Sequence, residues 1–253
     1  MLSGMGQPIL KVETVLLPTM LSAGQCKEKI VIVFDVLRAT TTISAALATG
    51  VKEIRVFGDL EAARNACCAF DRPRWLCGEA NCVAPPGFDL GNSPGQFDPK
   101  LAPDRTVFLS TTNGTKALIA ASEGEVVLAG ALVNAGAVAR RISTIAELVR
   151  GVVLLCAGTS GAVAMEDLLG CGAVMDRLEK AGVSIALADD IGRIASRLFK
   201  QNESNLPALL RDAAGGRNVL AAGLAEDIEF TARIDSIDRV GRFDPATRTI
   251  TSA

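Results

Sequence analysis

The sequence predicts an α/β protein with three layers, α/β/α, and a mainly parallel sheet. Unbroken apolar runs such as Ile30 to Phe34 are typical of strands that are buried on both faces, as in a parallel sheet. These runs alternate with helical patterns such as 134–149, which is the order expected of such a sheet. The 253 residues fit a single domain, 1–253, with a helical stretch near 185–225 as a candidate subdivision.

Local signals divide the chain into strands and helices. Short apolar or β-branched runs predict the strands, and periodic apolar residues predict the helices. The predicted strands lie at 9–17, 30–34, 53–57, 74–77, 106–109, 125–128 and 151–155, with a strand pair around Asp244-Pro245 between 235 and 253. The predicted helices lie at 43–47, 60–70, 117–121, 134–149, 164–181, 189–200, 205–212, 217–221 and 226–230.

Single residues mark several boundaries of these elements. Each of the threonines 40–42 is suited to cap the first helix, and Asp59 is expected to cap the second. Gly215-Gly216 is expected to break the helical stretch near the C-terminus. The segment 80–103 is rich in Gly and Pro but carries apolar residues, so we expect it to form a wall or lid of a site.

Charge and the lack of histidine limit the chemistry that this chain performs. Its 26 basic and 28 acidic residues give a formal charge of −2, and there is no Tyr, so no nucleic-acid partner is expected. Without histidine, Ser-His-Asp and Cys-His catalysis and His-ligated zinc are excluded. Acid–base chemistry then falls to Asp, Glu, Lys, Cys or water, and carboxylate ligands favour Mg²⁺ or Mn²⁺.

Cysteine content and hydropathy indicate where the protein works. The seven cysteines are odd in number and have apolar flanks, and the stretch 1–7 lacks the features of a signal peptide, so we expect a reducing cytoplasm. No apolar run is long enough to span a membrane, and no membrane partner is expected.

The stretch 29–42 combines a buried strand with polar residues at its end. Asp35 and Arg38 come directly after the apolar run, where ligands bind in open α/β sheets. An anion and a cation three residues apart suit a site that holds a metal and a phosphate-like group. The alternative is structural, because an Asp at a strand end is often only a helix cap or an Arg partner.

Three apolar strands each end in a small polar loop that leads into a helix. The loops are 35–41, 110–115 and 156–161, and in a parallel sheet all three would lie on one edge. Glycines and free N–H groups at helix starts favour an anion site there. Four carboxylates fall on the same side and would bracket a divalent cation: Asp35, Glu79, Glu166 and Asp167. The alternative for 166–167 is that acids are simply favoured in a first helical turn.

With these pieces the chain resembles the 2-phosphosulfolactate phosphatase (ComB-like) family. The pieces run in family order through nearly the whole chain: 35–42, 78–79, 87–94, 111–115, 156–158 with Gly161, and 166–167, with 227–230 and Asp235 as weaker matches. The stretch after Glu79 departs from the Arg and glycines that the family often has there.

The resemblance implies hydrolysis of 2-phosphosulfolactate to (2R)-3-sulfolactate and phosphate, a step of coenzyme M biosynthesis. It also implies a three-layer α/β/α fold, Mg²⁺ as cofactor and a homodimer. We expect Asp35, Arg38, Glu79 and Asn113 to be catalytic. Asp35, Glu166 and Asp167 are the expected metal ligands. The expected substrate-binding residues are Arg38, Thr40, Thr41, Asn92, Ser93, Thr112, Asn113, Gly114, Thr115 and Gly158, with Lys116 adding charge.

Other functions remain open from the sequence. Asp35 is suited either to hold the metal or to attack phosphorus itself. The same pocket would also serve an enzyme that acts on a sulfur-free phosphorylated hydroxy acid, or a non-catalytic sensor of a small dianion. A purely structural oligomer is less consistent with the polar strand ends, because a structural sheet gains nothing from them.

Overall fold

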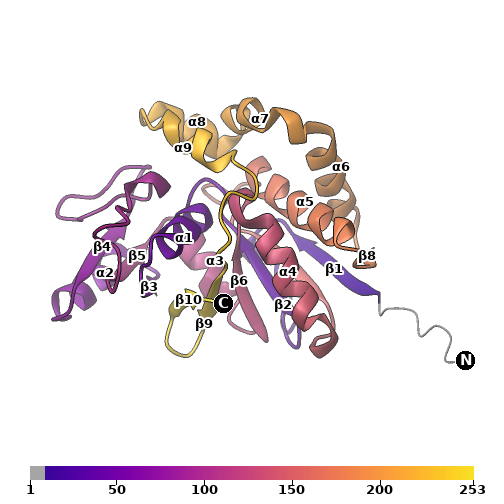
Figure 1. The fold of residues 1–253 in the computed structure, drawn as a ribbon, viewed down its shortest axis with the longest axis horizontal. Helices are drawn as coiled ribbons and strands as arrows, with labels where there is room; N and C mark the ends of the chain where they lie inside the picture. Colours follow the sequence, from indigo (N-terminus) through magenta and orange to yellow (C-terminus); the bar gives the residue numbers. More distant parts are fainter. Residues whose placement is uncertain (1–8) are drawn as a thin grey trace, which may run out of the picture.

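A ten-stranded sheet forms the centre of the computed structural model, which describes residues 9–253 (Figure 1). Its strand order is β4-β5-β3-β10-β9-β6-β2-β7-β1-β8. Six neighbouring pairs are parallel and three are antiparallel, so the mainly parallel sheet is confirmed. The strands are β1 (Leu10–Val15), β2 (Ile30–Phe34), β3 (Glu53–Phe57), β4 (Arg74–Gly78), β5 (Thr106–Ser110), β6 (Val126–Gly130), β7 (Val152–Cys156), β8 (Ile185–Leu187), β9 (Gly241–Asp244) and β10 (Thr249–Ser252). The prediction for 1–7 lies outside the described residues.

Helices cover both faces of the sheet, which confirms the three layers (Figure 1). On β2, Ile30, Ile32 and Phe34 pack into one core with α4 and α5, whereas Val31 and Val33 pack into a second core with α1 and α3. Alternate side chains of one strand therefore face opposite layers. The helices are α1 (Ala39–Ala48), α2 (Leu60–Cys68), α3 (Gly114–Ala120), α4 (Ala135–Ile145), α5 (Met165–Lys180), α6 (Asp190–Asn202), α7 (Leu206–Asp212), α8 (Ala214–Ala221) and α9 (Ala225–Thr231).

The sheet consists of two parallel blocks that run in opposite directions. The C-terminal hairpin β9–β10 lies between them and pairs antiparallel with β6 on one side and with β3 on the other. The strands β3, β4 and β5 therefore run against β6, β2, β7, β1 and β8. The expectation that one parallel edge aligns the three polar loops is wrong for the loop after β5. Neighbouring strands are twisted by about 20–25° relative to each other. This twist accumulates between β5 and β2, so the two strands are not directly antiparallel in space.

Several element boundaries differ from the sequence expectation. Helix α1 begins at Ala39 with Arg38 as the capping residue and no side-chain cap, so the threonines lie inside the helix and do not cap it. Helix α3 begins earlier than predicted, at Gly114. The pair Gly215-Gly216 lies within α8 and does not break the helical stretch. The Asp59 cap is confirmed, since its carboxylate accepts the Ala62 N–H at 2.8 Å.

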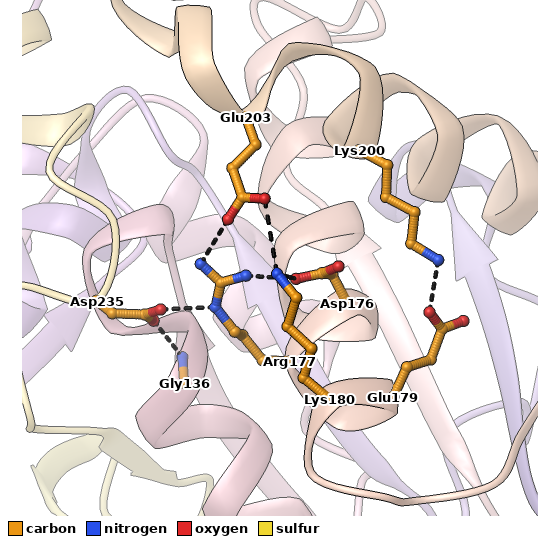
Figure 2. Close-up of polar contacts among 8 residues, drawn as sticks. All are labelled: Gly136, Asp176, Arg177, Glu179, Lys180, Lys200, Glu203 and Asp235. Carbon is orange, nitrogen blue, oxygen red and sulfur yellow. Dashed lines mark hydrogen bonds and ion pairs between the residues drawn. The ribbon is translucent and has the colours of Figure 1, made fainter.

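A network of ion pairs joins the helical layer to the C-terminal segment (Figure 2). Arg177 of α5 contacts Asp176, pairs with Glu203 after α6 at 2.9 Å, and pairs with Asp235 at 2.6 Å. Asp235 also accepts the N–H of Gly136, at the start of α4, at 2.6 Å. The guanidinium thus connects α5 with Glu203 and Asp235, and Asp235 extends the network to α4. Within 9–253, no helix is long and apolar enough to cross a membrane.

Candidate active site

Asp35 follows β2 directly and is held in place by the first turn of α1. The Thr40 hydroxyl accepts the Asp35 N–H at 3.1 Å and donates to its carbonyl oxygen at 2.9 Å. The Ala39 N–H donates to Oδ1 of Asp35 at 3.2 Å, while Oδ2 has no hydrogen-bond partner among the described residues. Burial, together with the charges of Glu79 and Glu166, raises the pKa of Asp35 to about 7.

Arg38 lies beside Asp35 with its guanidinium fixed by three partners. Its Nη1 donates to the Asp227 carboxylate at 2.6 Å and to the Ser93 hydroxyl at 3.1 Å, and its Nη2 donates to the carbonyl oxygen of Cys82. Ser93 in turn donates to Asp227 at 2.7 Å. A guanidinium has five N–H donors, so two of them, including that of Nε, have no partner among residues 9–253.

Asp227 is a site residue that the sequence did not reveal. It belongs to a weak match to the family pattern, but nothing in its local sequence assigned it a role. It lies in the first turn of α9, with a side chain that is 8% exposed. Only the tertiary contact with Arg38 explains the burial of an acid there, because a buried carboxylate needs a charged or hydrogen-bonding partner.

Asp167 connects two of the polar loops. Its Oδ1 accepts the N–H of Val36 at 2.9 Å, and its Oδ2 accepts the N–H of Gly158 at 3.0 Å. Burial and the nearby charges of Asp35 and Glu166 raise the pKa of Asp167 well above its usual range. Each oxygen of this carboxylate is therefore engaged by the main chain, as in a structural clamp between the loops after β2 and β7.

Glu166, one residue earlier on α5, keeps an unpartnered oxygen. Its Oε1 accepts the N–H of Gly215 at 2.9 Å and the Thr159 hydroxyl at 3.3 Å. Its Oε2 is buried and has no hydrogen-bond partner among the described residues. Burial raises the pKa of Glu166. An orphaned buried carboxylate oxygen is costly unless a cation or a proton satisfies it.

Glu79 joins the loops that follow β4 and β5. Its carboxylate accepts the N–H of Thr112 at 2.7 Å and the N–H of Cys82 at 3.1 Å. Asn113 accepts the N–H of Ser160, from the loop after β7, at 3.4 Å. The predicted convergence of the polar loops is therefore confirmed, although the strands before them are not all parallel.

Glycine allows the loop after β5 to approach Asp35. A Cβ atom on Gly114 would lie 2.7 Å from Oδ2 of Asp35 and 2.5 Å from the Ala39 side chain, closer than real Cβ atoms come. Gly158 has φ +72°, a conformation that favours glycine, and its N–H is occupied by Asp167.

A cavity of about 480 Å³ opens in front of these groups. Six of the predicted residues line it: Asp35, Arg38, Glu79, Asn92, Thr112 and Asn113. The structure places the other predicted residues outside its lining: Thr40, Thr41, Ser93, Gly114, Thr115, Lys116, Gly158, Glu166 and Asp167. The hydroxyls of Thr41 and Thr115 donate to main-chain oxygens at 2.8 and 2.9 Å and brace the loops.

Part of the cavity wall comes from a helix end that the sequence did not single out. Helix α8 contributes Gly215, Asn218 and Ala221, and Ala222 follows at its end. The expected role of 80–103 as a wall is confirmed, since 81–83 and Asn92 line the cavity. The α8 residues carry no charge or motif, so only the fold reveals them.

The carboxylates fit a metal that needs few protein ligands. Among the described residues, no group of three or more Cys, Asp or Glu side chains is arranged to hold a metal ion. Oδ2 of Asp35 and Oε2 of Glu166 nevertheless have no partner within 9–253, and the charge of Glu166 raises the pKa of Asp35. Mg²⁺ is often bound by one or two carboxylates plus water and substrate phosphate oxygens, which suits this donor set.

The sheet and the cavity define an α/β protein with a cavity at its strand ends, the place where such folds bind small ligands. Residues 15–245 match the family model described as 2-phosphosulpholactate phosphatase, and the chain belongs to this family, which consists of phosphoric monoester hydrolases.

Similar proteins named "Probable 2-phosphosulfolactate phosphatase" come from several bacteria. The protein of Caldanaerobacter subterraneus subsp. tengcongensis is 37% identical over 215 residues, 85% of this chain and 87% of its own. That of Synechococcus sp. (strain JA-3-3Ab) is 37% identical over 214 residues, 83% of this chain and 86% of its own. That of Clostridium beijerinckii is 29% identical over 235 residues, 92% of this chain and 97% of its own.

Proposed function

We propose that this protein is a Mg²⁺-dependent phosphatase that hydrolyses 2-phosphosulfolactate to (2R)-3-sulfolactate and inorganic phosphate, the reaction type of a coenzyme M biosynthesis step. Water supplies the oxygen that phosphorus gains, and the ester oxygen leaves as the hydroxyl of sulfolactate. Family membership supports the reaction class. The observation that carries the proposal is the fixed guanidinium of Arg38, which lies beside the buried carboxylate of Asp35 in one cavity.

Arg38 binds the phosphoryl group in this proposal. Its contacts with Asp227, Ser93 and Cys82 immobilise the guanidinium and leave two N–H donors for oxygen atoms of the substrate. Charge-assisted hydrogen bonds from a preorganised donor are strong, and no energy is spent on orienting the arginine when substrate arrives. Asn113 and Thr112 line the same part of the cavity and add uncharged polar groups.

Asp35 and Glu166 hold Mg²⁺ in this proposal, with Glu79 near enough to act on the charge of Asp35. When bound, the metal would neutralise charge on the phosphoryl oxygens. Asp167 is the least suitable of the three predicted metal ligands, because both of its carboxylate oxygens already accept main-chain N–H groups. Its role is to keep the loops after β2 and β7 together, and so to keep Asp35 in place.

Two further parts of the proposal concern the cell and the assembly. All seven cysteines, each within 9–253, are free thiols, which supports a reducing compartment such as the cytoplasm. A homodimer rests on the family resemblance alone. Light scattering of the purified protein tests it, since a mass near 26.3 kDa would identify a monomer.

Phosphate release from three esters tests the proposed function. Racemic 2-phosphosulfolactate, 2-phospholactate and 3-phosphoglycerate are each incubated with the protein, with Mg²⁺ and with EDTA. We expect Mg²⁺-dependent release that favours the sulfonated ester. Release from the sulfur-free esters alone would retain the phosphatase and reject the substrate. Binding of the esters without any release would favour a sensor of small dianions.

A further inference from the structure

The cavity lining has two chemically different parts. One part carries the charged groups Asp35, Arg38 and Glu79 at the strand ends. The other part belongs to α8, which contributes Asn218 and small apolar residues at its end. Arg38 is the only lysine or arginine among the described residues that line the cavity.

Helix α8 is fixed to the charged part through Glu166. The N–H of Gly215 donates to Oε1 of Glu166 at 2.9 Å, and a Cβ atom on Gly215 would lie 2.1 Å from the same oxygen. Asn218 stands three residues further along the helix, and residues at this spacing share one helix face. The position of the Asn218 backbone relative to Glu166 is thus set by the fold.

Three carboxamide side chains that line the cavity have no hydrogen-bond partner among residues 9–253: those of Asn81, Asn92 and Asn218. Asn81 and Asn218 are exposed, and Asn218 belongs to α8. Asn92 is only 3% exposed, and its Oδ1 is buried without a partner in the described part of the chain. Its position is nevertheless held, since its carbonyl oxygen accepts the Thr42 hydroxyl at 2.8 Å. Unpaired amides in a pocket are available to a ligand.

Neutral amides suit the part of the substrate that does not react. The proposed substrate carries a phosphoryl group on the oxygen of C2, a carboxylate on C1 and a sulfonate with three oxygen acceptors on C3. A sulfonate stays ionised at every physiological pH, so it needs hydrogen-bond donors and no proton source. Amide N–H groups supply these donors without competing with the metal site for the phosphoryl group.

We propose that Asn218 is a specificity-determining residue that donates a hydrogen bond to the sulfonate on C3 of the substrate. This inference rests on the proposed function. It assigns the helical segment α8 to substrate discrimination and the strand ends to the phosphoryl group. Asn92, next to Ser93 and Arg38, lies nearer the reacting end.

A comparison of two esters tests this inference. 2-Phosphosulfolactate and 2-phospholactate differ only in a sulfonate, so KM and kcat are measured for both with wild type, Asn218→Ala and Asn218→Asp. We expect KM for the sulfonated ester to rise about tenfold in Asn218→Ala and further in Asn218→Asp, because the new carboxylate repels the sulfonate. KM for 2-phospholactate, and kcat for either ester, should change less than about threefold.

Controls separate this inference from the proposed function. Asn65→Asp makes the same charge change on the exposed surface of α2 and should leave every constant unchanged. Binding of 3-sulfolactate and of lactate by calorimetry repeats the comparison without turnover. If Asn218→Ala weakens the binding of 3-sulfolactate and of lactate equally, or weakens neither, the inference is overturned. If wild type releases no phosphate but binds sulfolactate through Asn218, the proposed function fails and this inference holds.

Discussion

Asp227 shows how much of the site depends on one residue that does not line the cavity. Its carboxylate is 2.6 Å from Nη1 of Arg38, and the two side chains are 8% and 2% exposed. Burial of such a pair stabilises a fold only when both members are present, because a lone buried charge costs about 3–5 kcal/mol. Asp227 is thus a positioning residue that acts through Arg38.

Replacing Asp227 by Asn should therefore damage both stability and activity. We expect Asp227→Asn to lose about 3 kcal/mol of unfolding free energy in urea and about a hundredfold in kcat/KM, since Arg38 keeps its charge but loses its counter-ion. Glu229→Gln on the same helix is the matched control. Its ion pair with Arg211 is about half exposed and should contribute at most about 1 kcal/mol. Equal losses in both variants would refute the positioning role.

The raised pKa of Asp35 makes stability depend on pH in a defined direction. Asp35 has a pKa of about 7 in the folded protein and near 3.8 in the unfolded chain. Between these two pH values the folded protein keeps the proton that the unfolded chain has lost. The resulting stabilisation is complete below about pH 4 and is lost as pH rises through 7.

Asp35→Asn removes this dependence. In EDTA, we expect the variant to gain about 2.5 kcal/mol of stability relative to wild type between pH 5 and pH 8, because wild type must bury a charged carboxylate at the higher pH. Urea unfolding of both proteins at the two pH values gives the difference. A constant difference across this range would show that Asp35 does not titrate there.

At the scale of the element, α8 is the helix that the sequence described least well. Its glycines looked like a break, but they permit close contacts. A Cβ atom on Gly216 would lie 1.7 Å from the carbonyl oxygen of Leu210 in α7, and one on Gly215 would strike Glu166. Only the packing of α8 on α5 and α7 explains why glycines occupy a helix that they destabilise by about 1 kcal/mol each.

Gly215→Ala tests this account of α8. Alanine favours a helix, yet we expect the variant to lose about 1–3 kcal/mol of unfolding free energy, because its methyl group displaces the Glu166 carboxylate. Activity should fall as well, since Glu166 is a proposed metal ligand. Gly95→Ala is the control, because a Cβ atom there meets nothing within 4 Å. A Gly215→Ala protein as stable as wild type would argue against the close contact.

At the scale of the whole molecule, the sequence was informative about strands and less so about their arrangement. The buried run Ile30 to Phe34 was recognisable because both faces of β2 pack into cores. The short strand β8 was missed because it has only three residues, two of them partly buried and one exposed. The reversal of the β3 block was not predictable, since it depends on where the distant hairpin β9–β10 inserts.

The candidate site was predictable to a similar degree. Asp35, Arg38, Glu79 and Asn113 were found because polar residues follow strands, and strand ends are where α/β proteins bind ligands. The hydroxyls of Thr40 and Thr41 point to main-chain partners instead, which local sequence does not distinguish from ligand contacts. Residues supplied by helices that pack from the far end of the chain, such as Asp227, were visible only in the fold.

The Arg177 network in Figure 2 should stabilise the whole molecule without affecting the site. Its guanidinium, 15% exposed, has three carboxylate partners, and none of the network's members lines the cavity. We expect Arg177→Met to lower the unfolding free energy by about 1–3 kcal/mol and to leave KM unchanged. The control Lys200→Met breaks a half-exposed pair with Glu179 and should lose less than about 1 kcal/mol. A large change in KM would show that the network reaches the site.

The central claim is that Asp35 and Arg38 form the reacting centre of a Mg²⁺-dependent phosphatase. The most direct test is the rate of phosphate release from 2-phosphosulfolactate at saturating Mg²⁺ by wild type and by folded Asp35→Asn. The account predicts release by wild type that EDTA abolishes, and a loss of at least about a hundredfold in the variant. Turnover by Asp35→Asn close to that of wild type would contradict it.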